Sequence, residues 1–130
     1  MGIAQTLAPS ADINRRLIRL KFKVHIINGF LSNRKPLIIH CYSRDDDLGE
    51  HTLWMNDSFN FHFRVSLIRF THFWCFFQWD SHYKRMEVFQ LDDEYNLCFD
   101  TANCYWLVDE DGFFLSADNA TWYHRNDWNP

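Results

Sequence analysis

The chain has 130 residues, of which 47% are hydrophobic and 18% aromatic, so it is long enough to bury one core and too apolar to be disordered. Its net charge is −4, and its basic residues are scattered apart from a group between positions 15 and 23, which argues against the basic face of a nucleic-acid-binding protein. No apolar run approaches the ~18 residues of a membrane helix, and the first twenty residues lack the apolar core of a signal peptide. We therefore predict one soluble domain without nucleic-acid binding or membrane insertion.

The N-terminal region divides into an arm and the start of a sheet. Residues 1–18 show no steady period and are predicted to be a loosely held arm, followed by a single domain at 19–130. From Lys21 onward, apolar side chains alternate with polar ones as far as Ile26, the pattern of a half-buried strand. Asn28 and Gly29 then indicate a turn, and residues 32–36 a polar connection.

Residues 37–57 change from apolar to charged within a few positions. Residues 37–39 read as the buried end of a strand, with Cys41 at its exit. The charged residues 44–47 are predicted to form a turn that Gly49 closes, and residues 52–55 a short strand before a tight turn at Asn56 and Asp57.

The second half of the chain predicts further short strands. Phe59, Phe61 and Phe63 alternate with polar residues, while residues 71–79 form an aromatic run that we interpret as a central strand buried on both faces. Strands are also predicted at 82–90, 104–108 and 113–116, and a last one near 122–123, with an acidic irregular connection at 91–102. Seven or eight short strands with frequent turn signals predict an all-β fold, an antiparallel β-sandwich.

Four cysteines, an even number without a Cys-x-x-Cys pair, favour two disulfides and an oxidising compartment over a zinc site. Four cysteines permit three pairings. Two Asn-x-Ser/Thr triplets, at Asn56 and Asn119, are candidate glycosylation sites and agree with a secreted protein.

For the residues that could bind a metal, catalyse a reaction or stack on a sugar, a structural role is better supported. Residues 45–47 are three aspartates that could hold Ca²⁺, but consecutive residues cannot all converge on one ion, so we favour a turn capped by an aspartate. The histidines lack metal-binding pairs, and no nucleophile motif is present, so we predict no enzyme activity, no metal and no cofactor. Aromatic side chains could stack on sugars, although packing is their commoner use; the candidates are Trp79, Tyr83, Trp122 and Trp128.

Several segments together resemble the plant self-incompatibility protein family, the S-protein homologues. Residues 40–51, His-Cys-Tyr-Ser-Arg-Asp-Asp-Asp-Leu-Gly-Glu-His, are similar to the family's Cys-x-Ser-x-Asp-Asp-Asp-Leu-Gly-x-His hallmark. Residues 24–28, 71–75 and 104–113 resemble its first strand, its Leu-Phe-Trp-Cys strand and its Cys-x-Trp-x-Val-x-x-Asp-Gly-Tyr hairpin. Two departures, Asn56-Asp57 in place of a glycine turn and Phe113-Phe114 in place of tyrosine, concern turn chemistry and packing.

The resemblance implies a small secreted plant protein, a β-sandwich with two disulfides that acts as an extracellular ligand of a membrane receptor. We expect a monomer, with an apoplastic defence or glycan-binding module as the alternative function. For the disulfides we favour Cys41 with Cys104, both on core strands, which leaves Cys75 with Cys98. Polar loops on a rigid scaffold are the usual recognition sites; the predicted receptor contacts are Arg34, Lys35, Asp92, Asp93, Glu94, Tyr95 and Asn96.

Overall fold

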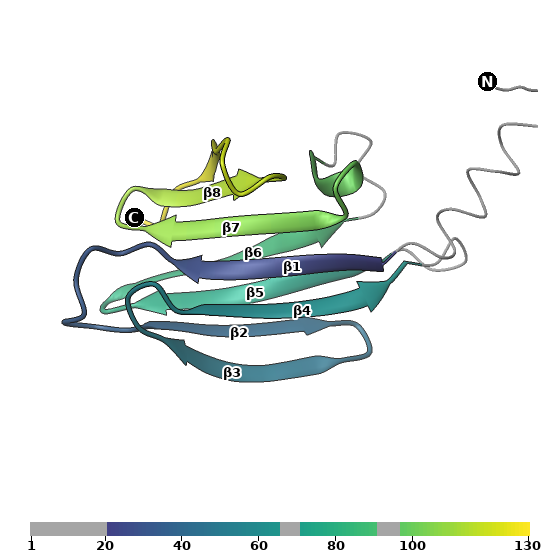
Figure 1. The fold of residues 1–130 in the computed structure, drawn as a ribbon. Coiled ribbons are helices and arrows are strands. Elements are labelled where there is room, and N and C mark those ends of the chain that lie inside the picture. Colours follow the sequence, from purple (N-terminus) through teal and green to yellow (C-terminus); the bar gives the residue numbers. More distant parts are fainter. Residues whose placement is uncertain (1–20, 66–70, 91–96) are drawn as a thin grey trace, which may run out of the picture.

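Two β-sheets stack face to face in the computed structural model, which describes residues 21–65, 71–90 and 97–130 (Figure 1). Sheet A has the strand order β4 (Ser58–Arg64), β1 (Lys21–Asn28), β7 (Asn103–Asp109), β8 (Gly112–Ser116) and β9 (Tyr123–Asn126). Sheet B has the order β3 (Asp47–Leu53), β2 (Leu37–Ser43), β5 (His72–Trp79) and β6 (His82–Gln90). The predicted all-β sandwich with two disulfides is confirmed, with nine strands in the described ranges.

One strand pair departs from the antiparallel prediction. β1 pairs with β4 antiparallel but with β7 parallel, with Val24 opposite Cys104. A parallel pair needs a long connection between its strands, and here the whole of sheet B lies between β1 and β7 in the sequence. The chain therefore leaves sheet A after β1, forms β2 and β3 of sheet B, returns to sheet A as β4, completes sheet B with β5 and β6, and comes back beside β1 as β7.

The core lies between the sheets and follows the period-two pattern. Phe22, Val24 and Ile26 of β1 are fully buried, as are Leu37 and Ile39 of β2. Burying one such side chain stabilises the fold by about 1.5–3 kcal/mol. The alternation seen in the sequence therefore identifies the inward face of β1 correctly, whereas Ile38 of β2, expected to be buried with its neighbours, is only half-buried.

Strand β5 is buried on one face only, contrary to the prediction that both faces are covered. Phe73, Cys75 and Phe77 point into the core, whereas Phe76 is 48% exposed and Trp74 is half-buried. The sequence of β5 does not show which side chains point inward, because aromatic residues occupy both the buried and the exposed positions of the strand. The outer face of sheet B consequently carries rings that are not part of the core.

The predicted charged turn between β2 and β3 is shorter than expected. β3 begins at Asp47 and runs to Leu53, so Gly49 lies within the strand, at a φ of 81° that favours glycine. The short strand expected at 52–55 is therefore the end of β3, and residues 54–57 form the turn to β4, with Asn56 at a φ of 70°.

The predicted disulfide pairing is wrong. Cys41 bonds to Cys75 and Cys98 bonds to Cys104. Cys41 of β2 lies directly opposite Cys75 of β5, whereas Cys104 is on the other sheet. The second bond joins the short 3₁₀ helix η1 (Leu97–Phe99) to β7, so neither bridge links the two sheets.

Candidate functional site

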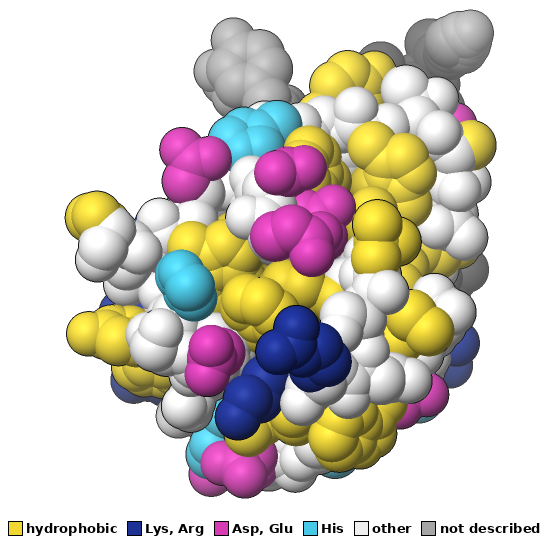
Figure 2. Space-filling view, turned by 90° about the vertical axis from the view of Figure 1, so that its left-hand side faces the viewer, with side chains coloured by type: hydrophobic (Ala, Val, Ile, Leu, Met, Phe, Trp, Pro, Cys, Tyr) yellow, Lys and Arg dark blue, Asp and Glu magenta, His cyan; other side chains and the backbone are white. Residues whose placement is uncertain are grey.

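The connections at one end of the sandwich form a continuous surface that we call the loop end. It consists of residues 29–36, 54–57, 80–81, 110–111 and 127–130. In Figure 1 these connections lie on the left, and Figure 2 looks onto that end. Hydrophobic side chains gather there beside a group of Lys and Arg side chains and a group of acidic ones.

A buried asparagine organises this end. Asn28, the last residue of β1, is fully buried. Its Nδ2 donates to the carbonyl oxygen of Leu53 at 2.8 Å, and its Oδ1 accepts from the backbone N–H of Phe30 at 2.8 Å. Its own N–H donates to the carbonyl of Asp57 at 2.9 Å, and its carbonyl accepts from the N–H of Asn56 at 3.0 Å. Because an unpaired buried polar group costs about 1–3 kcal/mol, these contacts fix both connections together.

Two further hydrogen bonds complete the link. The backbone N–H of Met55 donates to Oδ1 of Asn33 at 2.6 Å, which joins the two connections at their outer part. Within the turn, the N–H of Trp54 donates to Oδ2 of Asp57 at 2.9 Å. Residues 29–36 and 54–57 are thus held as one unit.

This unit presents apolar side chains next to basic ones. Leu31 is 87% exposed, Trp54 44% and Met55 37%, although large apolar side chains usually lie inside. Arg34 and Lys35, both predicted contacts, are exposed on the same connection. The sequence prediction of purely polar loops missed the apolar component, and the signal for it was a Trp-Met pair immediately before a tight turn.

Aromatic side chains pack beneath the surface of the loop end. Phe30 stacks on Trp79, with ring centroids 4.4 Å apart, and the indole N–H of Trp128 donates to the carbonyl of Asp109 at 2.8 Å. Trp79, a sugar-stacking candidate from the sequence, therefore serves packing, and Trp122 is half-buried. Tyr83 is 57% exposed, and its surroundings belong to the face of sheet B.

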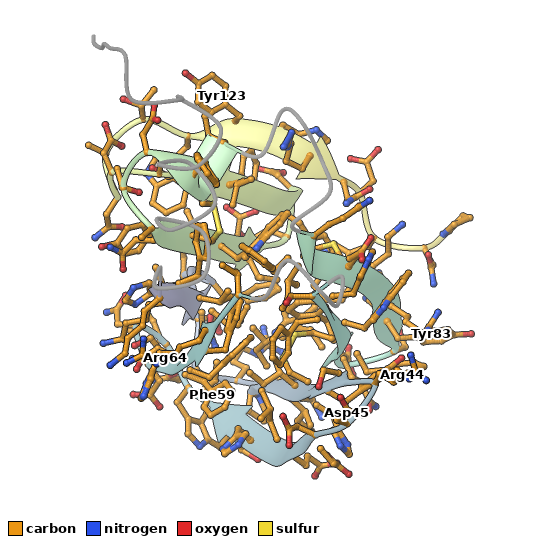
Figure 3. The ribbon with its side chains drawn as sticks, turned by 90° about the vertical axis from the view of Figure 1, so that its right-hand side faces the viewer. Arg44, Asp45, Phe59, Arg64, Tyr83 and Tyr123 are labelled. Atoms are coloured by element: carbon orange, nitrogen blue, oxygen red, sulfur yellow. A yellow bond between two sulfur atoms is a disulfide. The ribbon has the colours of Figure 1, made fainter. Side chains whose placement is uncertain are left out.

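The predicted contacts at 92–96 lie outside the described residues. The strands on either side show where that connection is attached: β6 ends at Gln90 and η1 begins at Leu97, both at the end opposite the loop end (Figure 1). Figure 3 looks at this opposite end, where Arg44 and Asp45 lie on the β2–β3 turn. Gln90 and Leu97, the described residues that flank this segment, therefore lie at the opposite end of the sandwich from Arg34 and Lys35.

The acidic β2–β3 turn has the structural role that we favoured. Oδ1 of Asp47 accepts from the N–H of Gly49 at 2.9 Å and lies 2.5 Å from Nε2 of His40. The hydrogen bond from Gly49, followed by the one from His40, lowers the pKa of Asp47 below its usual value. No group of three or more His, Cys, Asp or Glu side chains suited to a metal ion occurs within residues 21–65, 71–90 and 97–130.

Comparison with known proteins identifies the family. Residues 23–128 match the family model described as plant self-incompatibility protein S1. The chain belongs to this family. Its S1-family relatives include S-protein homolog 5 of Arabidopsis thaliana, which is 38% identical over 77 residues, 59% of this chain and 58% of that protein.

Two further S1-family relatives cover more of the chain. S-protein homolog 1 of Arabidopsis thaliana is 34% identical over 97 residues, 73% of this chain and 62% of that protein. Self-incompatibility protein S1 of Papaver rhoeas is 31% identical over 97 residues, 71% of this chain and 68% of that protein. The chain thus spans about three fifths of the length of the two Arabidopsis relatives, 58% and 62%.

A solved structure of an S1-family protein shares the fold. It is described as one of the self-incompatibility protein homologues, a widespread family of small, highly stable, secreted proteins from plants. The alignment has a TM-score of 0.65 at 18% identity and covers 85% of this chain and 96% of that chain. The described part of the present S1-family chain has no helix long and apolar enough to cross a membrane.

Both candidate glycosylation sites of this S1-family chain are on exposed turns. Asn56 and Asn119 are solvent-exposed and have positive φ values of 70° and 60°. Asparagine tolerates this backbone region better than most residues. Asn119 lies beside Asp118, whose carboxylate accepts from the N–H groups of Ala120 and Thr121. Glycosylation of both asparagines stays a prediction.

Proposed function

We propose that the protein is a secreted extracellular ligand that is recognised by a membrane receptor protein through the loop end. The observation that carries the proposal is the Asn28-centred unit, which holds exposed Leu31, Trp54 and Met55 beside Arg34 and Lys35. This surface is the region in which we place the receptor contact.

The composition of the unit suits a protein partner. Trp and Arg side chains are enriched among the residues that dominate binding energy, usually within a ring of weaker contacts. Trp54 and Arg34 stand on connections that are tied together by backbone and side-chain hydrogen bonds of Asn28 and Asn33, so little conformational freedom is lost on binding. Basic side chains at the rim would set the orientation of a receptor with a complementary acidic surface.

Secretion is supported by the cysteines and by the family. All four cysteines are in disulfides, bonds that form and persist in oxidising compartments. The solved relative is described as one of a family of secreted plant proteins. The candidate glycosylation sites at Asn56 and Asn119 agree with passage through the secretory pathway.

The experiment is a cell-surface binding assay on plant cells with fluorescently labelled, oxidised protein. The variant Arg34→Glu with Lys35→Glu reverses the charge of the loop end, and Arg44→Glu makes the same kind of change at the opposite end. We expect saturable, protease-sensitive binding that the loop-end variant loses and the Arg44 variant keeps. Equal binding by both variants would place recognition elsewhere.

The acidic segment is a second proposed contact and can be tested separately. Charge reversal at Asp92, Asp93 and Glu94 changes the segment between Gln90 and Leu97 and leaves every loop-end residue as it is. Loss of binding in this variant as well would mean that the receptor reaches both ends of the sandwich. Unchanged binding would remove the acidic segment from the interface.

A further inference from the structure

The outer face of sheet B is unusually aromatic. The register of its strands places outward side chains in three rows across the sheet. The first row is Tyr42, Trp74 and Glu87; the second is Glu50, His40, Phe76 and Arg85; the third is Thr52, Ile38, Gln78 and Tyr83. Each row thus contains at least one aromatic ring, on a face where solvent-exposed positions are normally polar. We call this surface the aromatic face.

A shallow groove of about 390 Å³ crosses the aromatic face. Phe76, 48% exposed, and Tyr83, 57% exposed, provide its rings. Polar side chains that donate and accept hydrogen bonds also line it, namely His40, Glu50 and Gln78. A few polar groups around apolar walls are the usual composition of a small-ligand site, and the volume falls within the usual range of roughly 300–1,000 Å³.

Side chains of the aromatic face next to the groove contact one another, and a disulfide lies beneath it. Nε of Arg85 donates to the hydroxyl of Tyr42 at 2.6 Å, and its guanidinium carbon lies 4.5 Å from the ring centroid of Trp74. The Cys41–Cys75 disulfide crosslinks β2 and β5, the two strands that form the floor of the groove. A preorganised site loses less conformational entropy on binding.

Charged side chains of both signs stand on this face. Asp47 is paired with His40 and Glu87 with His72. Glu50 and Arg85 stand at the two ends of the second row and have opposite charges. Among the residues of these rows there is no cluster of basic side chains for a polyanion to match, which favours a neutral ligand over an anionic one.

We propose that the aromatic face binds a neutral oligosaccharide. A sugar ring has an apolar C–H face and a rim of hydroxyl groups. The rings of Phe76 and Tyr83 can contact the face, while Glu50, Gln78 and His40 can accept from and donate to the hydroxyls. This site shares no residue with the loop end, which it adjoins where the N–H of Asn129 donates to the carbonyl of Tyr83 at 3.4 Å, and it does not depend on the proposed receptor function.

The test is a calorimetric titration of the oxidised full chain with neutral β-linked oligosaccharides: cellohexaose, xylohexaose and chitohexaose. Tryptophan fluorescence provides a second signal. We expect at least one of these sugars to bind, and oligogalacturonate, which is anionic, to bind more weakly. Binding of none of the neutral sugars at millimolar concentration would overturn the proposal, as would preferred binding of the anionic one.

Substitutions in the groove test whether the sugar binds there. Phe76→Ala and Tyr83→Ala are each expected to weaken binding by at least about tenfold, corresponding to about 1.4 kcal/mol. The matched control is Tyr123→Ala, which removes a tyrosine that is 50% exposed on β9 of sheet A and should leave affinity unchanged. Gln78→Ala, an exposed polar change, gives a further test if an aromatic variant fails to fold. Equal affinity of the wild type and all three groove variants would also overturn the proposal.

Discussion

The side-chain amide of Asn28 in sheet A donates a hydrogen bond to the backbone carbonyl of Leu53 in sheet B at 2.8 Å. This contact joins the two layers where β1 and β3 end. It also fixes the position of the β1–β2 connection relative to the β3–β4 turn. The shape of the loop end therefore depends on one buried polar side chain.

Replacing this side chain should be costly. Asn28→Ala leaves the carbonyl of Leu53 and the N–H of Phe30 without these partners in a buried site. We expect a loss of about 2–4 kcal/mol in the free energy of unfolding, measured by urea denaturation. The matched control is Asn33→Ala, which removes a solvent-exposed hydrogen bond to Met55 and should cost less than about 1.5 kcal/mol. Equal losses in the free energy of unfolding for the two variants would show that the buried hydrogen bonds of Asn28 do not stabilise the fold more than an exposed one.

The two disulfides should contribute unequally. Their sequence separations are 34 residues for Cys41–Cys75 and 6 for Cys98–Cys104. In the loop-entropy description, closing these loops stabilises by about 4 and about 2 kcal/mol. Removing the first pair by double alanine substitution should therefore lower the denaturation midpoint more than removing the second.

The pairing itself can be checked independently. Peptide mapping of the non-reduced protein should yield a crosslinked fragment that contains Cys41 and Cys75. A fragment that links Cys41 to Cys104 would contradict the structure.

The turn after β8 predicts a specific pH dependence. Hydrogen bonds from the N–H groups of Thr121 and Ala120, then from the Ser116 hydroxyl, lower the pKa of Asp118 to about 2. Because this pKa is below the unfolded value, the carboxylate stabilises the turn above the unfolded pKa, and this contribution is lost as pH falls through about 2.

Amide NMR can follow this turn. The N–H signals of Ala120 and Thr121 should keep their shifts from pH 6 to pH 3 and move only near pH 2. Asp118→Asn should reduce their protection from hydrogen exchange at neutral pH. A titration midpoint near the ordinary value of Asp, about 3.9, would show that these hydrogen bonds do not hold the carboxylate.

The sequence predicts the strands better than their connections. Alternation of Phe22, Val24 and Ile26 with polar residues is a local signal, so the buried face of β1 followed from it. The partner of Cys41 depends on which strands are neighbours, and that is decided by the whole topology. Knowledge that β2 pairs with β5 would have placed Cys75 opposite Cys41.

The candidate site was only partly predictable for the same reason. Arg34 and Lys35 were recognised because charged residues in a connection are normally exposed. The apolar contribution of Leu31 and Trp54 required knowing that their connections meet around Asn28. The aromatic face was hidden because the run at 71–79 looked like a strand buried on both sides, whereas Phe76 faces solvent.

The most direct test of the account measures binding to the plant cell surface before and after reversal of the loop-end charges. The wild type should bind saturably and lose binding when surface proteins are digested. Arg34→Glu with Lys35→Glu should reduce affinity at least about tenfold, a change of about 1.4 kcal/mol, while Arg44→Glu should bind like the wild type. Undiminished binding of the loop-end variant, or binding that survives digestion of surface proteins, would contradict receptor recognition through the loop end.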